Sequence, residues 1–249
     1  EYPSYTQEGD PVQLAPSHQD GFLSYRLVVG GDTIDLSNAT FTPTALALPL
    51  EGGDAAESPG FSYDNGAGFG VDLTYTFNAD SYLIGVSAQV TGLGGQPAIL
   101  LTELGPGLQP HEARDHHSER ELAVVLRANE DVERLRLGKL EGTTALPGPM
   151  SWVGLKDKYF VVAQIAGEER PFSGGSATRH DDVAQLLIEG RDTIATVLPR
   201  AEVRAELPVG GDGATAFQLY AGPQDFKQMA AAGHELEDVT QYAYAWLEP

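Results

Sequence analysis

The densest group of titratable side chains in this 249-residue chain lies in the segment His111-Glu-Ala-Arg-Asp115-His116-His117. Histidine and carboxylate groups together can bind zinc. On a helix, His111 and Asp115 would share one face, but His116 would lie beside neither of them. Nearby prolines and the flanking charges favour a solvated loop, with adventitious metal binding and a functional zinc site as the alternatives. We therefore expect no metal site here.

A second candidate for acid–base chemistry is His180-Asp181-Asp182. A histidine and a carboxylate can act as general acid and base, but this group follows Ser173-Gly-Gly-Ser, which is typical of a surface loop. A sugar mutarotase would need a histidine paired with a carboxylate on a concave face, and no motif joins His18, His180 or His234 to a glutamate. We interpret the group as structural and expect no catalytic residue.

The glycine pattern Gly66-Ala-Gly68-Phe-Gly70 resembles a dinucleotide-binding loop. Such a loop must follow a strand and open a helix, whereas this one precedes a stretch with strand periodicity. It therefore predicts a flexible entry into a strand, and no cofactor.

Three aromatic residues, Trp152, Tyr159 and Phe160, lie within nine positions of one another. They could form a platform on which a sugar or a peptide stacks. Large aromatic residues on a strand are more often buried, so we predict that all three belong to the core. Gly154 then gives the backbone conformational freedom. The lysines predicted to face water are Lys156 and Lys158.

The charge composition argues against two classes of partner. The chain has 15 Lys and Arg residues against 36 Asp and Glu residues, a net charge of −21. Such a field repels nucleic acid and anionic lipid headgroups. The absence of cysteine excludes disulfides, thiolate metal clusters and a thiol nucleophile. No apolar run approaches the roughly 18–20 residues of a membrane-spanning helix, so we expect the chain itself not to be embedded in a membrane.

Alternating apolar residues predict β-strands along most of the chain. Residues 69–77 and 82–90 alternate on either side of Asn78-Ala-Asp-Ser81, which is typical of a turn. A second hairpin is predicted at 23–29 and 34–36. Further strands are predicted at 98–103, 122–128, 132–137, 152–165, 193–198, 201–207 and 216–220.

Segments rich in Gly, Pro, Ser and acidic residues predict loops. These segments are 51–60, 105–110, 143–149 and 173–182. None is long enough to be an interdomain linker, so residues 1–249 are predicted to form a single domain.

Helix signals are confined to the C-terminal end. Pro223 is typical of a first helical turn, and Gly233 is typical of a helix C-cap. A stripe of apolar residues then predicts a second short helix packed against the strands. The stripe consists of Leu236, Val239, Ala243 and Trp246. Many strands followed by short helices predict an all-β fold, a large antiparallel β-sandwich of two unequal sheets. Apart from short turns, helix is expected only in about the last 25 residues.

Four short sequence segments, taken together in their order along the chain, are more specific for a protein family than any one of them alone. They are Tyr75-Thr-Phe-Asn-Ala-Asp-Ser-Tyr82, Trp152–Phe160, Tyr220-Ala-Gly-Pro223 and Asp238–Trp246. Their residue types and order resemble the large periplasmic domain of the YidC family of bacterial membrane-protein insertases, over residues 70–249. Ala243 and Tyr244 depart from the Gly and Trp that are usual in the family. The family-signature residues, expected to be structural, are Phe77, Tyr82, Trp152, Gly154, Tyr159, Phe160, Gly222, Pro223, Tyr242 and Trp246.

The resemblance implies a β-supersandwich of the kind shared with galactose mutarotase. It implies that the leading strands of the domain are missing and that residues 223–249 are a helical segment leading toward the membrane. The domain would be a non-enzymatic monomer, without cofactors, on the periplasmic side of the bacterial inner membrane.

The full-length protein, as the resemblance implies, would insert and fold inner-membrane proteins, alone or with the Sec translocon. Its partners would be Sec components and nascent membrane proteins, and not nucleic acid. The alternative function is a carbohydrate-binding or carbohydrate-active supersandwich protein. The two differ after Pro249, where an insertase would continue into an amphipathic segment and a spanning helix.

Overall fold

The structure is a computed structural model that describes residues 12–15, 21–45, 50, 56–108, 121–186 and 194–240, with side chains described except at 182–186 and 194–199. Strand is the main element. The strands are β1 Leu23–Val29, β2 Asp32–Asp35, β3 Thr42–Pro43, β4 Ala56–Glu57, β5 Gly60–Asp64, β6 Gly70–Asn78, β7 Leu83–Thr91, β8 Ala98–Gly107, β9 Ala123–Ala128, β10 Asp131–Arg136, β11 Thr143–Lys156, β12 Phe160–Ala166, β13 Phe172–Leu186, β14 Ile194–Pro208 and β15 Ala214–Pro223. The helices are η1 Leu137–Lys139, α2 Phe226–Ala232 and η2 Leu236–Thr240.

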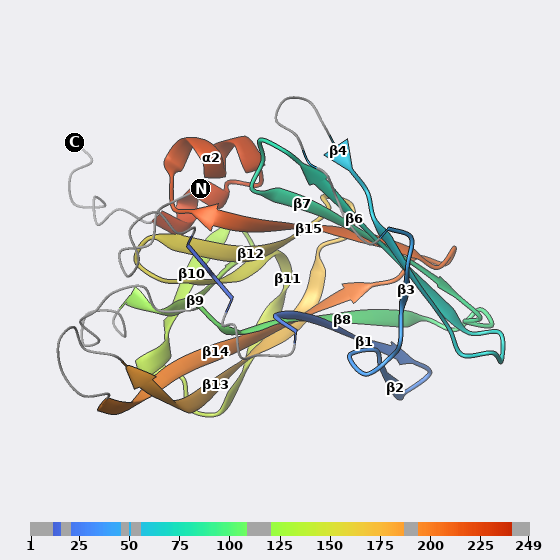
Figure 1. The fold of residues 1–249 in the computed structure, drawn as a ribbon, viewed down its shortest axis with the longest axis horizontal. Coiled ribbons are helices and arrows are strands. Elements are labelled where there is room, and N and C mark those ends of the chain that lie inside the picture. The colour runs from blue at the N-terminus through green and yellow to red at the C-terminus, as the bar shows by residue number, and fades with distance from the viewer. Residues whose placement is uncertain are drawn as a thin grey trace.

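The strands form an antiparallel sandwich, which confirms the predicted fold class. Figure 1 shows two layers, with β6, β7, β15 and β12 in one and β1, β8, β14 and β13 in the other. The predicted two unequal sheets are in fact one continuous sheet, because hydrogen bonds connect the layers in the order β2-β1-β8-β14-β13-β11-β12-β15-β7-β6-β5-β3. No helix in the described part of the chain has the length and apolar character needed to span a bilayer.

The continuity of the sheet depends on the long strand β11. Its first half pairs with β13, from Thr143 to Met150. Its second half pairs with β12 on one side and with β9 on the other, through Trp152 to Lys156. A register shift between Pro147 and Met150 separates the two halves. The strand therefore passes from one layer to the other.

Both predicted hairpins are confirmed. Strands β6 and β7 pair from Gly70↔Thr91 to Phe77↔Ile84 around the turn at Asn78 to Ser81. Strands β1 and β2 pair around Gly30 and Gly31, which have φ values of 60° and 97°. Glycine adopts these left-handed conformations without steric cost.

All four predicted loops are wrong wholly or in part. Residues 143–149 belong to β11, and residues 173–182 belong to β13. The predicted loop 105–110 begins inside β8, which continues to Gly107, and the predicted loop 51–60 contains β4 and the first residue of β5. The error at β13 has a physical reason, because Gly175 lies against the backbone carbonyl oxygen of Arg204 in the neighbouring strand, where a Cβ atom would clash. Glycine here permits close strand packing and does not mark a loop.

Two predicted strand boundaries also change. The predicted strands at 193–198 and 201–207 are one strand, β14, because its pairing with β13 continues through Arg200↔His180. The predicted strand at 152–165 is instead the hairpin of β11 and β12, closed by a turn at Asp157 to Tyr159.

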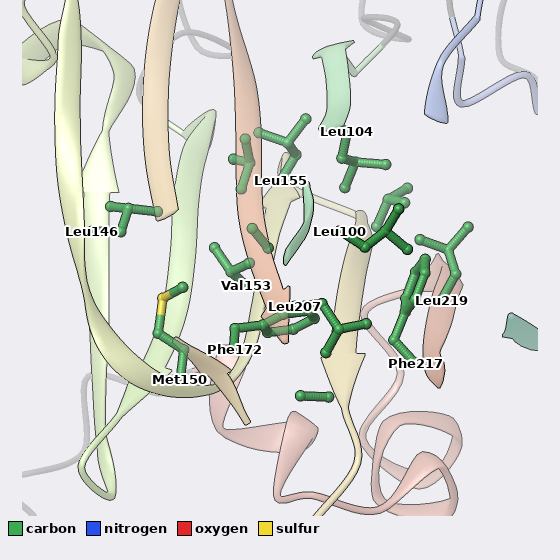
Figure 2. Packing of buried hydrophobic residues seen from close by; sticks show 14 of the residues in the cluster. Leu100, Leu104, Leu146, Met150, Val153, Leu155, Phe172, Leu207, Phe217 and Leu219 are labelled. Atoms are coloured by element: carbon green, nitrogen blue, oxygen red, sulfur yellow. The ribbon is translucent and has the colours of Figure 1, made fainter. Parts of the chain in front are cut away.

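The main core lies between the two layers. It contains Leu27 and Leu100 from one layer and Val86 and Phe217 from the other, each 4 % exposed or less. Figure 2 shows ten labelled members of this core, among them Leu100, Leu207, Phe217 and Leu219, gathered in one cluster. Burying apolar side chains of this size is the main favourable term in folding.

A second core covers the outer face of β12 and β15. Met229 and Ala232 of α2 and Leu236 and Val239 of η2 pack against it. The strand residues of this second core are Val125, Trp152, Val161, Ala163, Ile165 and Tyr220. Figure 1 shows α2 lying over β15. The prediction that the C-terminal apolar stripe packs on the strands is confirmed for Leu236 and Val239, and its other members lie outside the described residues.

The start of the helix differs from the prediction. Pro223 is the last residue of β15 and not a first-turn residue. Helix α2 begins at Phe226, and its N-cap is Asp225, whose Oδ1 accepts a hydrogen bond of 3.0 Å from the backbone N of Gln228. A carboxylate at this position satisfies a backbone donor that the helix leaves unpaired. Gly233 is the C-cap, as predicted, with φ of 77°.

Lys156 is buried, at 6 % exposure, so the prediction that it faces water is wrong. It lies where β11 is flanked by both β9 and β12. Burial lowers the pKa of Lys156 to about 8, helped by the positive charge of Arg134 and opposed by Glu121 and Asp157.

Replacing Lys156 with methionine is expected to raise the free energy of unfolding at neutral pH by about 1–2 kcal/mol. This is less than the free energy that corresponds to the lowered pKa of Lys156, because the surroundings relax around the buried charge. Below about pH 8 the folded state carries the cost of the buried charge. Between about 8 and 10.5 the folded state has lost the proton while the unfolded state keeps it, so wild-type stability rises with pH and the difference shrinks. Denaturant titrations of both proteins at neutral and alkaline pH measure this. The exposed Lys158→Met is the matched control, and an equal gain in that variant would contradict the explanation.

Candidate functional site

The titratable groups singled out in the sequence do not assemble into a catalytic site in the described structure. The histidine-rich segment 111–117 lies outside the described residues. His180 and Asp181 lie on β13 and not on a loop, and Asp181 pairs with Arg179 at 2.9 Å. Among the described residues, no group of three or more His, Cys, Asp or Glu side chains is placed to hold a metal ion.

His180 does have a carboxylate neighbour that spacing in the sequence could not reveal. Its Nε2 lies 3.8 Å from Oε2 of Glu202 on β14, which is too long for a hydrogen bond. The two side chains are 37 % and 25 % exposed. Neither lines the groove described next.

An apolar groove of about 1020 Å³ is lined by β1, by the segment 36–41 that follows β2, and by β3, β5 and β6. The described residues that line it are Gly21, Leu23, Ser24, Tyr25, Leu36, Ser37, Ala39, Phe41, Pro43, Ala45, Pro59, Phe61, Leu73, Tyr75 and Phe77. Its lining comes from the two opposite ends of the strand order. The groove is thus a product of tertiary folding.

Two tyrosines provide polar atoms in the lining. The hydroxyls of Tyr25 and Tyr75 lie 2.8 Å apart and share a hydrogen bond. Burial raises the pKa of Tyr25 well above its ordinary value, and burial also raises the pKa of Tyr75. Both phenols therefore stay protonated at neutral pH. The groove can accommodate apolar groups, but these phenols are not suited to act as a base.

A charged network borders the groove. Glu103 is 6 % exposed and accepts hydrogen bonds from Arg204 Nε at 2.7 Å and from Ser24 Oγ at 3.2 Å. Arg26 lies 3.2 Å from the same carboxylate. Since a buried carboxylate requires such partners, the network accounts for Glu103 without any ligand.

Five of the eight signature residues in the described part of the chain lie around the end of β15 and the C-terminal helices. Trp152 is fully buried, and its Nε1 donates a hydrogen bond of 3.1 Å to the carbonyl oxygen of His234, just before η2. Tyr82 packs against Gly222, where a Cβ atom would lie 2.7 Å from the ring. Phe160, which is also buried, pairs with Pro223 across β12 and β15. This arrangement holds the strand exit and the helix together.

Gly154 has a different role from the predicted one. Its backbone does not need unusual freedom. Instead, a Cβ atom at this position would overlap the carbonyl oxygen of Val162 and lie 2.6 Å from Cα of Ala163. Glycine is therefore required because β12 approaches closely.

The remaining signature residues do not belong to this buried group. Phe77 lines the groove. Tyr159 is 42 % exposed, so its prediction as a core residue is wrong, because it lies in the turn between β11 and β12. Tyr242 and Trp246 lie outside the described residues. Among the other groove residues, Tyr25 and Tyr75 belong to predicted hairpins, but nothing in the sequence brings the two hairpins together.

The glycine pattern Gly66 to Gly70 lies at the entry to β6, as predicted. Gly66 and Gly68 have φ values of 72° and 87°. The backbone N of Gly66 bonds to Asp64 and that of Phe69 bonds to Asn65. The segment is a strand connection and opens no helix.

Comparison with known proteins identifies the family. The sequence model of the YidC periplasmic domain matches residues 1–248. A protein named membrane protein insertase YidC from Chlorobium phaeovibrioides is 28 % identical over 95 % of this chain and 40 % of its own length. A protein of the same name from Chlorobaculum parvum is 25 % identical over 96 % of this chain and 40 % of its own length. The chain thus spans about two fifths of these relatives.

Among solved structures, an α-galactosidase from Geobacillus stearothermophilus matches with a TM-score of 0.45 and 16 % identity, over 94 % of this chain and 33 % of that chain. The order of the four sequence segments, the sandwich and the family match agree. The chain belongs to the YidC periplasmic domain family.

Proposed function

We propose that this chain is the periplasmic domain of a membrane protein insertase and lies on the periplasmic side of the bacterial inner membrane. The observation that carries the proposal is the family match over residues 1–248. Relatives named membrane protein insertase YidC support it over most of the chain. The same match favours the insertase function over the carbohydrate alternative.

The activity of the whole protein is the insertion and folding of inner-membrane proteins, alone or with the Sec translocon. Its partners are nascent membrane proteins and Sec components, reached through parts of the protein beyond this chain. Residues 1–249 act as one monomeric domain, which serves the rest of the protein as a docking surface, a spacer or a tether. The packed C-terminal segment supports this mechanical role, since α2 and η2 are fixed to the strands by a shared core.

The domain itself is non-catalytic in this proposal. Support comes from the chemistry of the groove, which is lined mainly by apolar side chains and by two tyrosines that stay protonated at neutral pH. The charged residues beside it are engaged with one another.

Reconstitution tests the insertase proposal. The parent protein, purified and placed in lipid vesicles, is supplied with a newly synthesised inner-membrane protein, and insertion is measured by protection from protease. Empty vesicles are the control. Insertion only in vesicles that contain the parent protein is expected, and equal insertion in both preparations would contradict the proposal.

A separate prediction concerns sugars. Calorimetric titration of this chain with hexoses and disaccharides is expected to show no binding tighter than about millimolar, because the groove has few polar groups to orient a sugar. Measurement of anomeric interconversion of the same sugars is expected to show no acceleration. A micromolar affinity would favour the carbohydrate alternative.

A further inference from the structure

Large hydrophobic side chains are strongly exposed at three positions in the described chain. They are Leu50 at 37 %, Tyr159 at 42 % and Phe226 at 55 % exposure. Single exposed apolar residues are ordinary, whereas a group of them marks a contact surface. We call these three residues the apolar rim.

The members of the rim lie along one end of one strand layer. Leu50 lines a small pocket together with Tyr82 and Ala221, and the backbone N of Ala221 bonds to the carbonyl oxygen of Tyr82 at 3.0 Å. Ala221 lies near the end of β15, two residues before its last residue, Pro223. The rim therefore begins at the turn of β6 and β7 and reaches the exit of β15.

Gln224 connects the end of β15 to the other two members of the rim, Tyr159 and Phe226. Its backbone N donates to the carbonyl oxygen of Tyr159 at 2.7 Å, and its Nε2 donates to the carbonyl oxygens of Asp157 and Phe160 at 2.6 and 3.1 Å. Two residues later, Phe226 begins α2. The turn that carries Tyr159 and the helix that carries Phe226 are thus fixed to each other, at the end of the layer where Figure 1 shows α2.

Lysines lie beside the two aromatic members of the rim. Lys158 and Lys227, two of only four lysines in the sequence, directly flank Tyr159 and Phe226. The Lys158 Nζ lies 4.7 Å from the centre of the Tyr159 ring. Two carboxylates beside these residues, Asp157 and Asp225, accept hydrogen bonds from backbone N–H groups. Each of the two aromatic rings of the rim therefore has a lysine as a direct neighbour, although the chain as a whole has a net charge of −21.

We propose that the apolar rim contacts the lipid bilayer, with Tyr159 and Phe226 entering the headgroup layer of electrically neutral lipids. This inference rests on the proposed function, which places the domain beside a membrane. Aromatic rings flanked by lysine are the side chains that favour a membrane–water interface, because the ring is amphipathic and the long lysine stem lets its ammonium group stay in water. The net charge of the chain disfavours anionic surfaces, so aromatic burial and not charge provides the attraction.

Site-specific fluorescence quenching tests the contact. The chain has no cysteine, so Ala230→Cys gives a single labelling site that is exposed and one turn beyond Phe226 on α2. Thr33→Cys on β2, also exposed, gives the control site. Phosphatidylcholine vesicles that carry a nitroxide-labelled lipid are expected to quench the label at position 230 and not at position 33. Phosphatidylglycerol vesicles are expected to quench less at low salt, because the acidic chain is repelled.

Variants of the rim complete the test. Tyr159→Ser with Phe226→Ser is expected to weaken partitioning into phosphatidylcholine vesicles at least about tenfold, because the apolar area of two rings is lost. Tyr159→Phe with Phe226→Tyr keeps two aromatic rings and is expected to retain it. Both side chains are exposed, so unchanged denaturation midpoints are expected for both variants.

Three results would overturn the inference. They are no quenching at position 230, equal quenching at position 33, and quenching that the serine variant leaves unchanged. Stronger binding to phosphatidylglycerol that salt abolishes would also overturn it, because charge would then be the cause. Failure here, with insertion by the reconstituted parent protein intact, would refute the lipid contact and leave the insertase proposal standing.

Discussion

Replacing Gly154 with alanine is expected to lower the free energy of unfolding by about 3 kcal/mol. The added Cβ would overlap the carbonyl oxygen of Val162 and lie 2.6 and 2.7 Å from Cα and Cβ of Ala163. Two of these atoms are backbone atoms of β12, a strand paired on both sides. They cannot move away without breaking the pairing of β12 with β15.

Chemical denaturation of Gly154→Ala beside Gly138→Ala measures this effect. Gly138 lies in η1, and a Cβ atom there would meet nothing within 4 Å. The control variant is expected to unfold at or above the wild-type midpoint, since alanine restricts the unfolded chain more than glycine does. Equal midpoints for the two variants would show that close strand packing is not the role of Gly154.

Replacing Trp152 with alanine is expected to cost about 3–5 kcal/mol and to loosen the C-terminal segment from the sandwich. Trp152 is fully buried in the second core, and its Nε1 donates a hydrogen bond to the carbonyl oxygen of His234. Leu236→Ala, at a fully buried position of η2, is expected to cost about 2–5 kcal/mol for the same reason. Trp152→Phe is the matched control, because it keeps a large ring and loses only the hydrogen bond.

Denaturation midpoints report the loss of stability, and hydrogen exchange at the backbone amides of Met229 and Leu236 reports the docking. Both amides donate hydrogen bonds in the folded state, to Asp225 and Gly233. Faster exchange in Trp152→Ala than in Trp152→Phe is expected. If Trp152→Ala and Leu236→Ala both unfold at the wild-type midpoint, the C-terminal segment does not depend on the second core.

The parts of the fold that could be predicted from the sequence are those set by neighbours in the chain. The β6–β7 hairpin is an example, because strict alternation and a polar turn lie within one short segment. The burial of Trp152 and Phe160 also followed from residue type. The C-cap at Gly233 followed from the conformation that only glycine adopts readily.

The errors occurred where distant strands decide the outcome. Gly174 and Gly175 have the composition of a loop, yet they lie in β13 because β11 and β14 pair on either side. Lys156 has a charged side chain of a type that usually faces water, yet β9 and β12 pair on either side of its strand and bury it. Its burial depends on contacts that no local pattern contains.

The candidate site was still less predictable. The groove needs β1 and β6 to face each other, although Tyr25 and Tyr75 are 50 residues apart. The exposure of Tyr159 depends on the tight turn in which Asp157 accepts hydrogen bonds from the backbone of Tyr159 and Phe160. The family resemblance indicated which residues matter and did not indicate how they are arranged.

The most direct test of the proposed insertase role is made in cells. The parent protein is produced in bacteria depleted of their own insertase, and insertion of a model inner-membrane protein is followed by the access of protease from the periplasmic side. The account predicts that the parent protein restores insertion, whereas a parent protein that carries the unfolding variant Gly154→Ala reaches a lower level in the membrane. A parent protein that accumulates stably in the membrane and restores no insertion would contradict it.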